Sequence, residues 1–310
     1  MSYDGISITS AEIAEKLEKK KISASLVTDL LQGCPAAWVA KSFVLRDIIE
    51  EEPDNALRRG SMFHKVMEDF FAHPAEERTA KLIKSLVHEV LNEGEFADLG
   101  QQPEAVKWLR GAVNGYWNME EKPEEVVIAE IPTKRGNKPG LEVFVAGQIG
   151  EASRSSLGFI YRVSQTEDGG VRVEDWKSGA KAKVWNPKTK STDGLGEARQ
   201  QIIYTMLLEQ MGVNVTGARL IFPVAGKIVN VDTTDETFRK RVVEDVEEAD
   251  RKLDVLIETN KFEFNPSALC AWCPLAKLCP EAQILPNPKM RKAFDSQPGP
   301  EVLMKGIDLQ

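Results

Sequence analysis

Long apolar runs are missing from this sequence. In its 310 residues no uninterrupted apolar stretch approaches the ~18 residues that a transmembrane helix needs. The first stretch, 1–21, also lacks the apolar h-region of a secretory signal peptide. We therefore expect no membrane contact and a cytoplasmic location.

An excess of positive charge is missing as well. The chain has 40 Lys and Arg against 48 Asp and Glu, which gives a net charge of −8. This balance argues against a uniformly basic nucleic-acid-binding protein, although a local basic surface is compatible with it. The apolar fraction of 42% is enough for a sizeable core, built as one elaborated domain or as two.

Cysteine is scarce, and its spacing is informative. Cys270-x-x-Cys273 and Cys279 lie close together near the end of the chain, whereas Cys34 stands far upstream. Disulfides are disfavoured in a cytoplasmic chain, and zinc sites more often show two paired C-x-x-C knuckles or added histidines. Three of these cysteines precede proline, as often happens at cluster ligands, so an iron–sulfur cluster is favoured over zinc.

Two kinds of periodicity divide the chain. Helical patterns prevail up to residue 117, and short strands with β-branched and aromatic residues follow from residue 126. A turn at Asp168-Gly169-Gly170 joins two of these strands. Helices flanking a central mixed sheet imply an α/β (α+β) architecture. The first expected helix opens at a capping box, 9–12. The other expected helices are 23–33, 35–48, 58–71, 75–91, 103–117, 196–212 and 233–259, and the expected strands are 126–133, 141–149, 157–163, 171–177, 218–224 and 227–232.

The strand 171–177 ends in Asp175-Trp176-Lys177. Asp175 and Lys177 share one face of it, because side chains alternate across a strand. A carboxylate and an ammonium side by side can hold a divalent metal next to a group that orients water or phosphate. By itself, D-x-K occurs often by chance on surface strands.

Three further polar residues stand at helical spacing. His64 closes the stretch Gly60-Ser-Met-Phe-His, and Gln200 and Tyr204 lie one helical turn apart. Taken singly, each has an ordinary interpretation as a surface or partly buried residue. Their interest comes from their order in the chain.

A lysine-rich loop follows the D-x-K strand. It contains Trp185 and no acidic residue from 176 to 192. Charged loops are usually just solvated, but one beside a metal site is a candidate track for phosphates and stacked bases. Its lysines are Lys177, Lys181, Lys183, Lys188 and Lys190.

In this order the motifs carry a resemblance. G-x-x-x-H, G-x-I-x-R at 158–162, D-x-K, Q-x-x-x-Y and C-x2-C-x5-C with one upstream Cys-Pro resemble the RecB-like branch of the PD-(D/E)xK nucleases. The resemblance spans about residues 23 to 282 and is strongest to stand-alone iron–sulfur exonucleases related to CRISPR-associated nucleases, phage-borne versions included. It implies a restriction-endonuclease-like fold and a DNA exonuclease that uses Mg or Mn, in a bacterial or phage-infected host cell.

The resemblance also implies roles for individual residues. His64 and Asp175 would be metal ligands beside the Trp176 carbonyl, and Lys177 would position the attacking water and stabilise charge on the phosphate. Gln200 and Tyr204 would help to hold the DNA or the site. A 4Fe–4S cluster would be bound by the four cysteines, Cys34, Cys270, Cys273 and Cys279.

Four regions follow from the resemblance. They are a helical N-terminal region at 1–122, a nuclease core at 123–262, a cysteine segment at 263–285 that packs back on the N-terminal region, and an extended tail at 286–310. The expected partners are DNA, single-stranded or with free ends, and a recombination or replication protein.

One position departs from the family pattern. The motif G-x-I-D-R reads Gly-Phe-Ile-Tyr-Arg here, so Tyr161 stands where a metal-bridging aspartate is expected. Tyrosine is neutral near pH 7 and a poor ligand for hard cations, so we expect weak cleavage. Glu130 on a neighbouring expected strand is the candidate substitute acid. The alternatives are a catalytically inactive DNA- or partner-binding protein with this fold and, less favoured, a zinc-stabilised interaction module.

Overall fold

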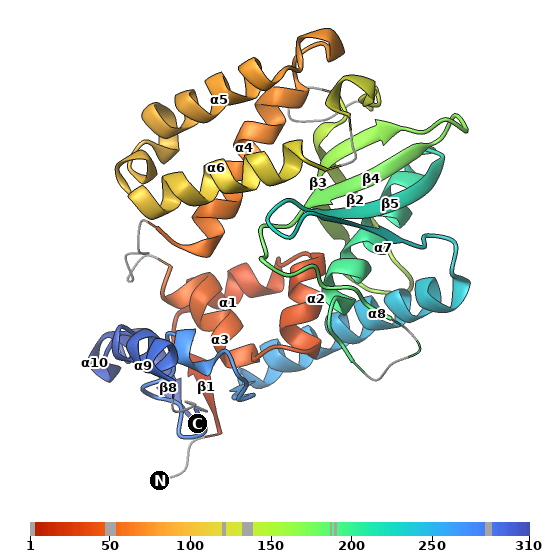
Figure 1. Ribbon diagram of the computed structural model, residues 1–310. Helices are drawn as coiled ribbons and strands as arrows, with labels where there is room; N and C mark the ends of the chain where they lie inside the picture. Colours follow the sequence, from red (N-terminus) through yellow and green to blue (C-terminus); the bar gives the residue numbers. More distant parts are fainter. Residues whose placement is uncertain are drawn as a thin grey trace. The chain divides into compact units, whose positions relative to one another are not determined.

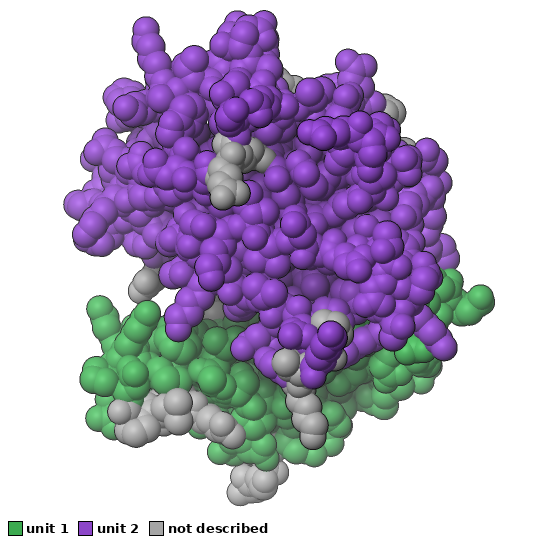
Figure 2. All heavy atoms as spheres, turned by 45° about the vertical axis from the view of Figure 1, so that its right-hand side comes forward, with its two compact units in different colours: residues 1–50, 150–156, 243–310 green, residues 51–149, 157–242 purple. Residues whose placement is uncertain are grey.

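The computed structural model describes residues 4–46, 54–119, 122–131, 139–186, 188, 191–282 and 287–310 (Figure 1). The chain forms two compact units, coloured separately in Figure 2. Unit 1 comprises residues 1–50, 150–156 and 243–310, and unit 2 comprises residues 51–149 and 157–242. No helix within the described ranges is long and apolar enough to cross a membrane.

Unit 2 is built on a five-stranded sheet of order β2-β3-β4-β5-β6. β3 and β4 run antiparallel, β4 and β5 parallel, and β5 and β6 antiparallel, so the sheet is mixed, as the sequence predicts. The strands are β2 (Leu141–Gly147), β3 (Ser156–Gln165), β4 (Val171–Trp176), β5 (Val215–Phe222) and β6 (Lys227–Val231).

Glycine is required at two points of the β3–β4–α7 region. Gly169 has a φ of 81° and forms the turn that joins β3 to β4, a conformation that glycine adopts without strain. At Gly158 of β3, an added Cβ would lie 2.2 Å from the ring of Tyr204 on α7 (Leu195–Gln210). The glycine therefore lets α7 pack closely on the sheet.

Three helices cover the side of the sheet on which Trp176 lies. They are α4 (Ala56–Phe71), α5 (Ala80–Asn92) and α6 (Pro103–Trp117), and they pack side by side (Figure 1). The side-chain oxygens of Asn55 and Thr79 cap the starts of α4 and α5. Phe63, Val66, Met67 and Phe70 form an apolar stripe on α4 that is buried in a common core with Trp176 and Ile221. Each such side chain contributes about 1.5–3 kcal/mol.

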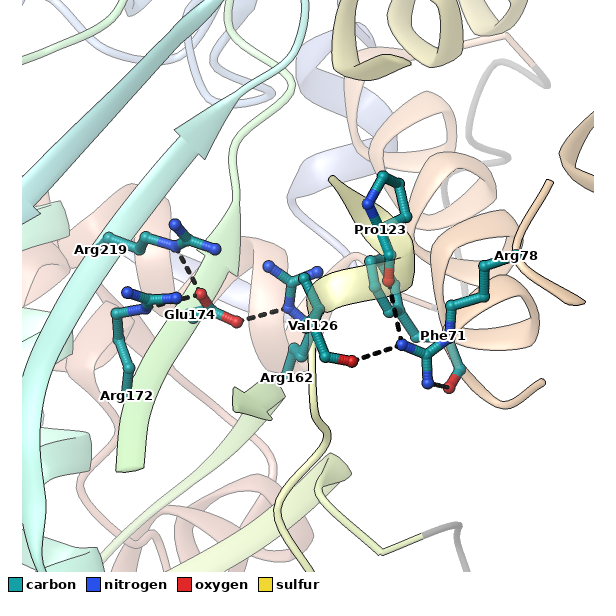
Figure 3. Close-up of polar contacts among 8 residues, drawn as sticks. All are labelled: Phe71, Arg78, Pro123, Val126, Arg162, Arg172, Glu174 and Arg219. Carbon is teal, nitrogen blue, oxygen red and sulfur yellow. Dashed lines mark hydrogen bonds and ion pairs between the residues drawn. The ribbon is translucent and has the colours of Figure 1, made fainter. Parts of the chain in front are cut away.

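Arg78 ties the end of this helical layer to the chain that leads into the sheet. Its guanidinium donates to the carbonyl oxygens of Phe71, Pro123 and Val126, at 3.3, 3.2 and 2.6 Å (Figure 3). These bonds satisfy carbonyls around the 3-10 helix Pro123–Glu125. The other 3-10 turns of unit 2 are Ala75–Glu77, Gly94–Phe96 and Leu99–Gln101.

Unit 1 joins the two ends of the chain. Its three-stranded sheet has the order β7-β1-β8, with both outer strands antiparallel to β1. The long helix α8 (Glu236–Thr259) begins in unit 2 and ends here. The remaining elements are β1 (Gly5–Ile8), α1 (Ala11–Glu18), α2 (Ala24–Leu31), α3 (Pro35–Val39), the π-helix Ala40–Val44, β7 (Phe262–Glu263), the 3-10 turn Cys270–Trp272, α9 (Pro288–Asp295), α10 (Pro300–Leu303) and β8 (Ile307–Leu309).

The structure differs from the expected elements in three places. The segment 286–310 is not an extended tail, because Asn287 caps α9, Pro288 begins it, and β8 pairs with β1. The stretch 126–131 makes only a bridge from Ile128 to Ser164 instead of a strand, and 132–138 lie outside the described residues. The two compact units also cut across the four regions expected from the sequence.

Candidate active site

Asp175 is buried at the end of β4, where it faces one charged partner. It is 1% exposed, and neither carboxylate oxygen has a hydrogen-bond partner of good geometry among the described residues. The Lys177 ammonium forms an ion pair with it, 2.6 Å from Oδ2. Burying a carboxylate is costly unless it is paired and hydrogen-bonded. The position therefore suits a carboxylate that meets a cation.

His64 on α4 reaches the same strand end. Its Nε2 donates a hydrogen bond to the Trp176 carbonyl oxygen, 2.9 Å away. Burial lowers the pKa of His64, and the charge of Asp175 only partly opposes this effect. The imidazole is therefore neutral near pH 7, which is the form that binds metals.

Lys177 is held from its other side by α7. Its ammonium donates to Oε1 of Gln200 at 2.7 Å, and Nε2 of Gln200 donates to the Tyr204 hydroxyl at 2.9 Å. Burial raises the pKa of Tyr204 to about 12, so the phenol stays protonated. This chain of contacts fixes the direction of the lysine side chain.

Tyr161 packs against the histidine. The two ring centroids lie 3.7 Å apart, at an interplanar angle of 66°. Burial raises the pKa of Tyr161, and the nearby Asp175 and Glu142 raise it further. A neutral phenol at this position supplies no charged oxygen to a hard cation.

Glu142 on β2 is an acidic residue at this site that the sequence pattern does not single out. It lines a cavity of about 420 Å³ together with His64, Tyr161 and Glu68. Burial, together with the charges of Glu68 and Asp175, raises its pKa to about 7. In LEVFVAG its alternation with buried apolar residues is typical of an ordinary outward-facing strand position, so no signal distinguished it.

The structure places Glu142, and not Glu130, beside Asp175, and Glu130 is exposed. Glu142 has a φ of 47°, which is unusual for a residue with a side chain. Even so, no group of three or more His, Cys, Asp or Glu side chains in the described ranges is arranged to hold a metal ion.

The lysine-rich loop differs in part from the expectation. Lys181, Lys183 and Lys188 are exposed, and Lys190 lies outside the described residues. Trp185 is not free to stack on a base, because its ring stacks on Phe238 of α8 with centroids 4.0 Å apart. The tryptophan thus anchors the loop and leaves Lys181, Lys183 and Lys188 exposed.

The four cysteines converge within unit 1. Cys34, Cys270, Cys273 and Cys279 all line one cavity of about 210 Å³. The backbone N–H groups of Asn265 and Ser267 donate to the sulfurs of Cys34 and Cys270, at 3.3 and 3.2 Å. Backbone hydrogen bonds from Leu275 and Glu281 favour the thiolates of Cys273 and Cys279.

One property of this cavity favours a thiolate-bound group, and another opposes it. Each sulfur has a backbone hydrogen bond, a contact that tunes cluster thiolates. Burial nevertheless raises the pKa of Cys273 to about 11, and the sulfurs are not among any group of metal-binding geometry in the described residues. The four sulfurs are therefore gathered around one cavity, and a bound cluster would require their deprotonation.

Residues 21–280 match the family model of the PD-(D/E)XK nuclease superfamily. No curated protein matches the chain. Among solved structures, a provisionally named exonuclease from Eubacterium rectale is similar, with a TM-score of 0.49 and 13% identity over 90% of this chain and 95% of that one. A similarity of this size carries no inference about activity.

The family match covers β3, β4 and α7, which carry the Asp175–Lys177 pair and its contacts. It also covers α4 with His64, and the mixed sheet agrees with the fold of that family. The chain belongs to the PD-(D/E)XK nuclease superfamily.

Proposed function

We propose that this protein is a divalent-metal-dependent DNA exonuclease of the RecB-like branch, with activity lowered by Tyr161. The observation that carries the proposal is the buried Asp175 carboxylate, which pairs with the Lys177 ammonium at 2.6 Å and has no hydrogen bond of good geometry among the described residues. His64 stands beside it at the Trp176 carbonyl.

The proposed metal ligands are His64, Asp175 and the carbonyl oxygen of Trp176, with Glu142 as an added acid. A bound Mg or Mn ion would polarise the scissile phosphate and lower the pKa of an attacking water. Glu142 would lose its proton more readily when a cation offsets the charges of Glu68 and Asp175.

Lys177 would act on the attacking water and on the phosphate. Its ammonium points between Asp175 and Gln200, so it is oriented and charged where a phosphate would bind. A fixed cation there would orient the attacking water and stabilise the negative charge that develops on the phosphate. Gln200 and Tyr204 position the lysine and do not themselves contact the reacting atoms.

The test is degradation of end-labelled single- and double-stranded DNA in Mg and in Mn, with a closed circular substrate in parallel. An exonuclease shortens the linear strands and leaves the circle intact. Lys177→Ala should abolish the cleavage that the wild type shows. Equal products from wild type and Lys177→Ala, or cutting of the circle, would contradict the proposal.

A second candidate function has its own support. Tyr161 packs on His64 where the third ligand is expected, and this favours a protein that binds DNA or a partner without cutting it. In that case DNA binding would persist in the absence of divalent metal and would not change in Asp175→Asn. Metal-dependent turnover by the wild type would exclude this alternative.

We also propose that the cysteine cavity binds a 4Fe–4S cluster. The support is that four cysteines, one upstream and three downstream, line one cavity and accept backbone hydrogen bonds. When bound, the cluster would link the two ends of the chain within unit 1.

Anaerobic purification, visible absorption and metal analysis test the cluster. We expect a brown protein with about four irons, and a colourless one in Cys34→Ser. If the four thiolates act as one unit, Cys34→Ser and Cys279→Ser should lower Tm by nearly the same amount singly and together. Stoichiometric zinc in a colourless wild type would rule the cluster out.

A further inference from the structure

Three arginines surround one buried glutamate in unit 2. Glu174 on β4 lies between its register partners Arg162 on β3 and Arg219 on β5. Its Oε2 accepts from Arg162, and its Oε1 pairs with both Arg172 and Arg219 (Figure 3). Since side chains alternate along β4, this group lies on the face opposite Asp175.

Positive charge exceeds negative charge in this group. Glu174 and Arg162 are both 0% exposed, and one carboxylate serves three guanidinium groups. Uncompensated buried charge is costly, and burial lowers the pKa of Arg219 to about 10. A further anion would therefore stabilise the arrangement.

Two of the three arginines reach a cavity. Arg172 and Arg219 line a space of about 680 Å³, and Ser164, the register partner of Arg172, lines it too. Ser164 is 1% exposed, yet its hydroxyl has no hydrogen-bond partner among the described residues. Buried hydroxyls in proteins are generally hydrogen-bonded, so this one is available to a ligand.

Acidic residues also line this cavity, but two of them have partners nearby. Glu125 pairs with Lys122 at 2.7 Å. Asp168 accepts hydrogen bonds from the Thr166 hydroxyl and the Gly170 N–H, at 2.6 and 3.2 Å. Glu167, the third acid of the lining, is exposed to solvent. The inner wall at the sheet is therefore the positive part of the cavity.

We propose that this space, the arginine cavity, binds a phosphate group through Arg172, Arg219 and the Ser164 hydroxyl. A guanidinium presents its donors in a fork that matches two phosphate oxygens, and a serine hydroxyl donates to a third. The site is distinct from the candidate active site, because Arg172 lies five residues before Lys177, about 17 Å along the strand. It does not depend on the proposed function.

Calorimetry with inorganic phosphate in a chloride buffer tests the site. Wild type should bind phosphate saturably, and its Tm should rise with phosphate concentration. Arg172→Gln should weaken binding about tenfold or more, since it removes a charged hydrogen-bond donor. Arg251→Gln, which removes an exposed arginine on α8, is the matched control and should bind as the wild type does.

Ser164→Ala is a second test of phosphate binding if Arg172→Gln does not fold. A weaker affinity in this variant supports the site. Saturable binding that neither substitution changes, or no saturable binding by the wild type, would overturn it. A short oligonucleotide without terminal phosphates identifies the source: competition with phosphate indicates a phosphodiester, and simultaneous binding indicates a free phosphate compound.

Discussion

At the scale of single residues, the same surroundings have different consequences for Glu142 and Tyr161. Both lie near Asp175, and burial raises the pKa of each. For Tyr161 this keeps a neutral group neutral. For Glu142 it brings the pKa of the carboxyl group to about 7. Near that pH a modest change in local charge decides its protonation state.

Tyr161→Asp should raise cleavage. The aspartate would remove the ring that packs on His64 and add a charged oxygen beside Asp175. A full set of hard ligands improves both affinity and geometry for Mg, so we expect a gain of roughly 10²-fold or more. Paired assays in Mg and in Mn measure it, with Tyr161→Phe as the control that keeps the ring. Strong cleavage by the wild type, without a gain in the aspartate variant, would show that position 161 is not a ligand position.

Glu142→Gln should change how stability depends on pH. In the native state the carboxyl has a pKa of about 7 against an ordinary 4.5, so the folded form holds a proton that the unfolded form loses between these values. The free energy of unfolding therefore falls as pH rises from about 5 to 8. The fall is about 1–2 kcal/mol, because solvent screens part of the repulsion from Glu68 and Asp175.

Urea unfolding in EDTA at several pH values measures this effect. The glutamine variant should lose less stability than the wild type over that range. Glu124→Gln, at an exposed position, serves as the control and should follow the wild type. Parallel curves for wild type and Glu142→Gln would show that Glu142 titrates normally.

At the scale of elements, β4 presents different charged side chains on its two faces through its alternation. Asp175 lies toward α7, whose Gln200 and Tyr204 hold Lys177, while Glu174 lies on the opposite face with the arginines. The loop after β4 is anchored by Trp185 on Phe238, and its Lys181, Lys183 and Lys188 are exposed to solvent. One strand and its following loop therefore concentrate most of the chemistry of unit 2.

Neutralising Lys181, Lys183 and Lys188 together should weaken DNA binding. Each phosphate contact releases counterions, so the slope of log affinity against log salt should fall by about 2 for single strands. Fluorescence anisotropy at several salt concentrations measures the slope. The control neutralises three exposed lysines elsewhere in unit 2, Lys81, Lys84 and Lys107. An unchanged affinity and slope would mean that the loop is only a solvated surface.

At the scale of the whole molecule, the chain leaves unit 1 near residue 50 and returns to it twice. The short segment 150–156 is held there by Asp250 of α8, which accepts from the N–H and hydroxyl of Ser153 and from the Arg154 guanidinium. Long-range contacts of this kind connect residues about one hundred positions apart in the sequence.

Asp250→Asn should destabilise the protein by about 2–4 kcal/mol, because it leaves the Arg154 guanidinium without its buried partner. Asp254→Asn removes the other carboxylate that pairs with Arg154 and should cost less than about 1 kcal/mol, since solvent screens that pair. Asp250 is 4% exposed and the Asp254 side chain 47%, which is the basis of the contrast. Equal losses in chemical denaturation would show that burial does not separate the two ion pairs.

Much of the fold was predictable, because local pattern decided it. The apolar stripe of α4, the turn at Gly169 and the alternation of β4 each follow from short-range rules. The segments 126–131 and 286–310 were wrongly assigned, since their structure depends on pairing with distant residues such as Ser164 and the strand β1. Lys177 contacts Asp175 and Gln200, which belong to the motifs recognised in the sequence. The catalytic roles of these residues stay predictions.

The sequence by itself determined the order of the motifs, the alternation that places Asp175 and Lys177 together, and the presence of tyrosine at position 161. Only the tertiary structure decided that Glu142 is the acid near Asp175, that Trp185 is packed on Phe238, and that Glu174 is shared by three arginines. The physical reason is that charge and packing act through space. A carboxyl group's pKa depends on burial and on neighbouring charges, and residues far apart in the sequence supply both.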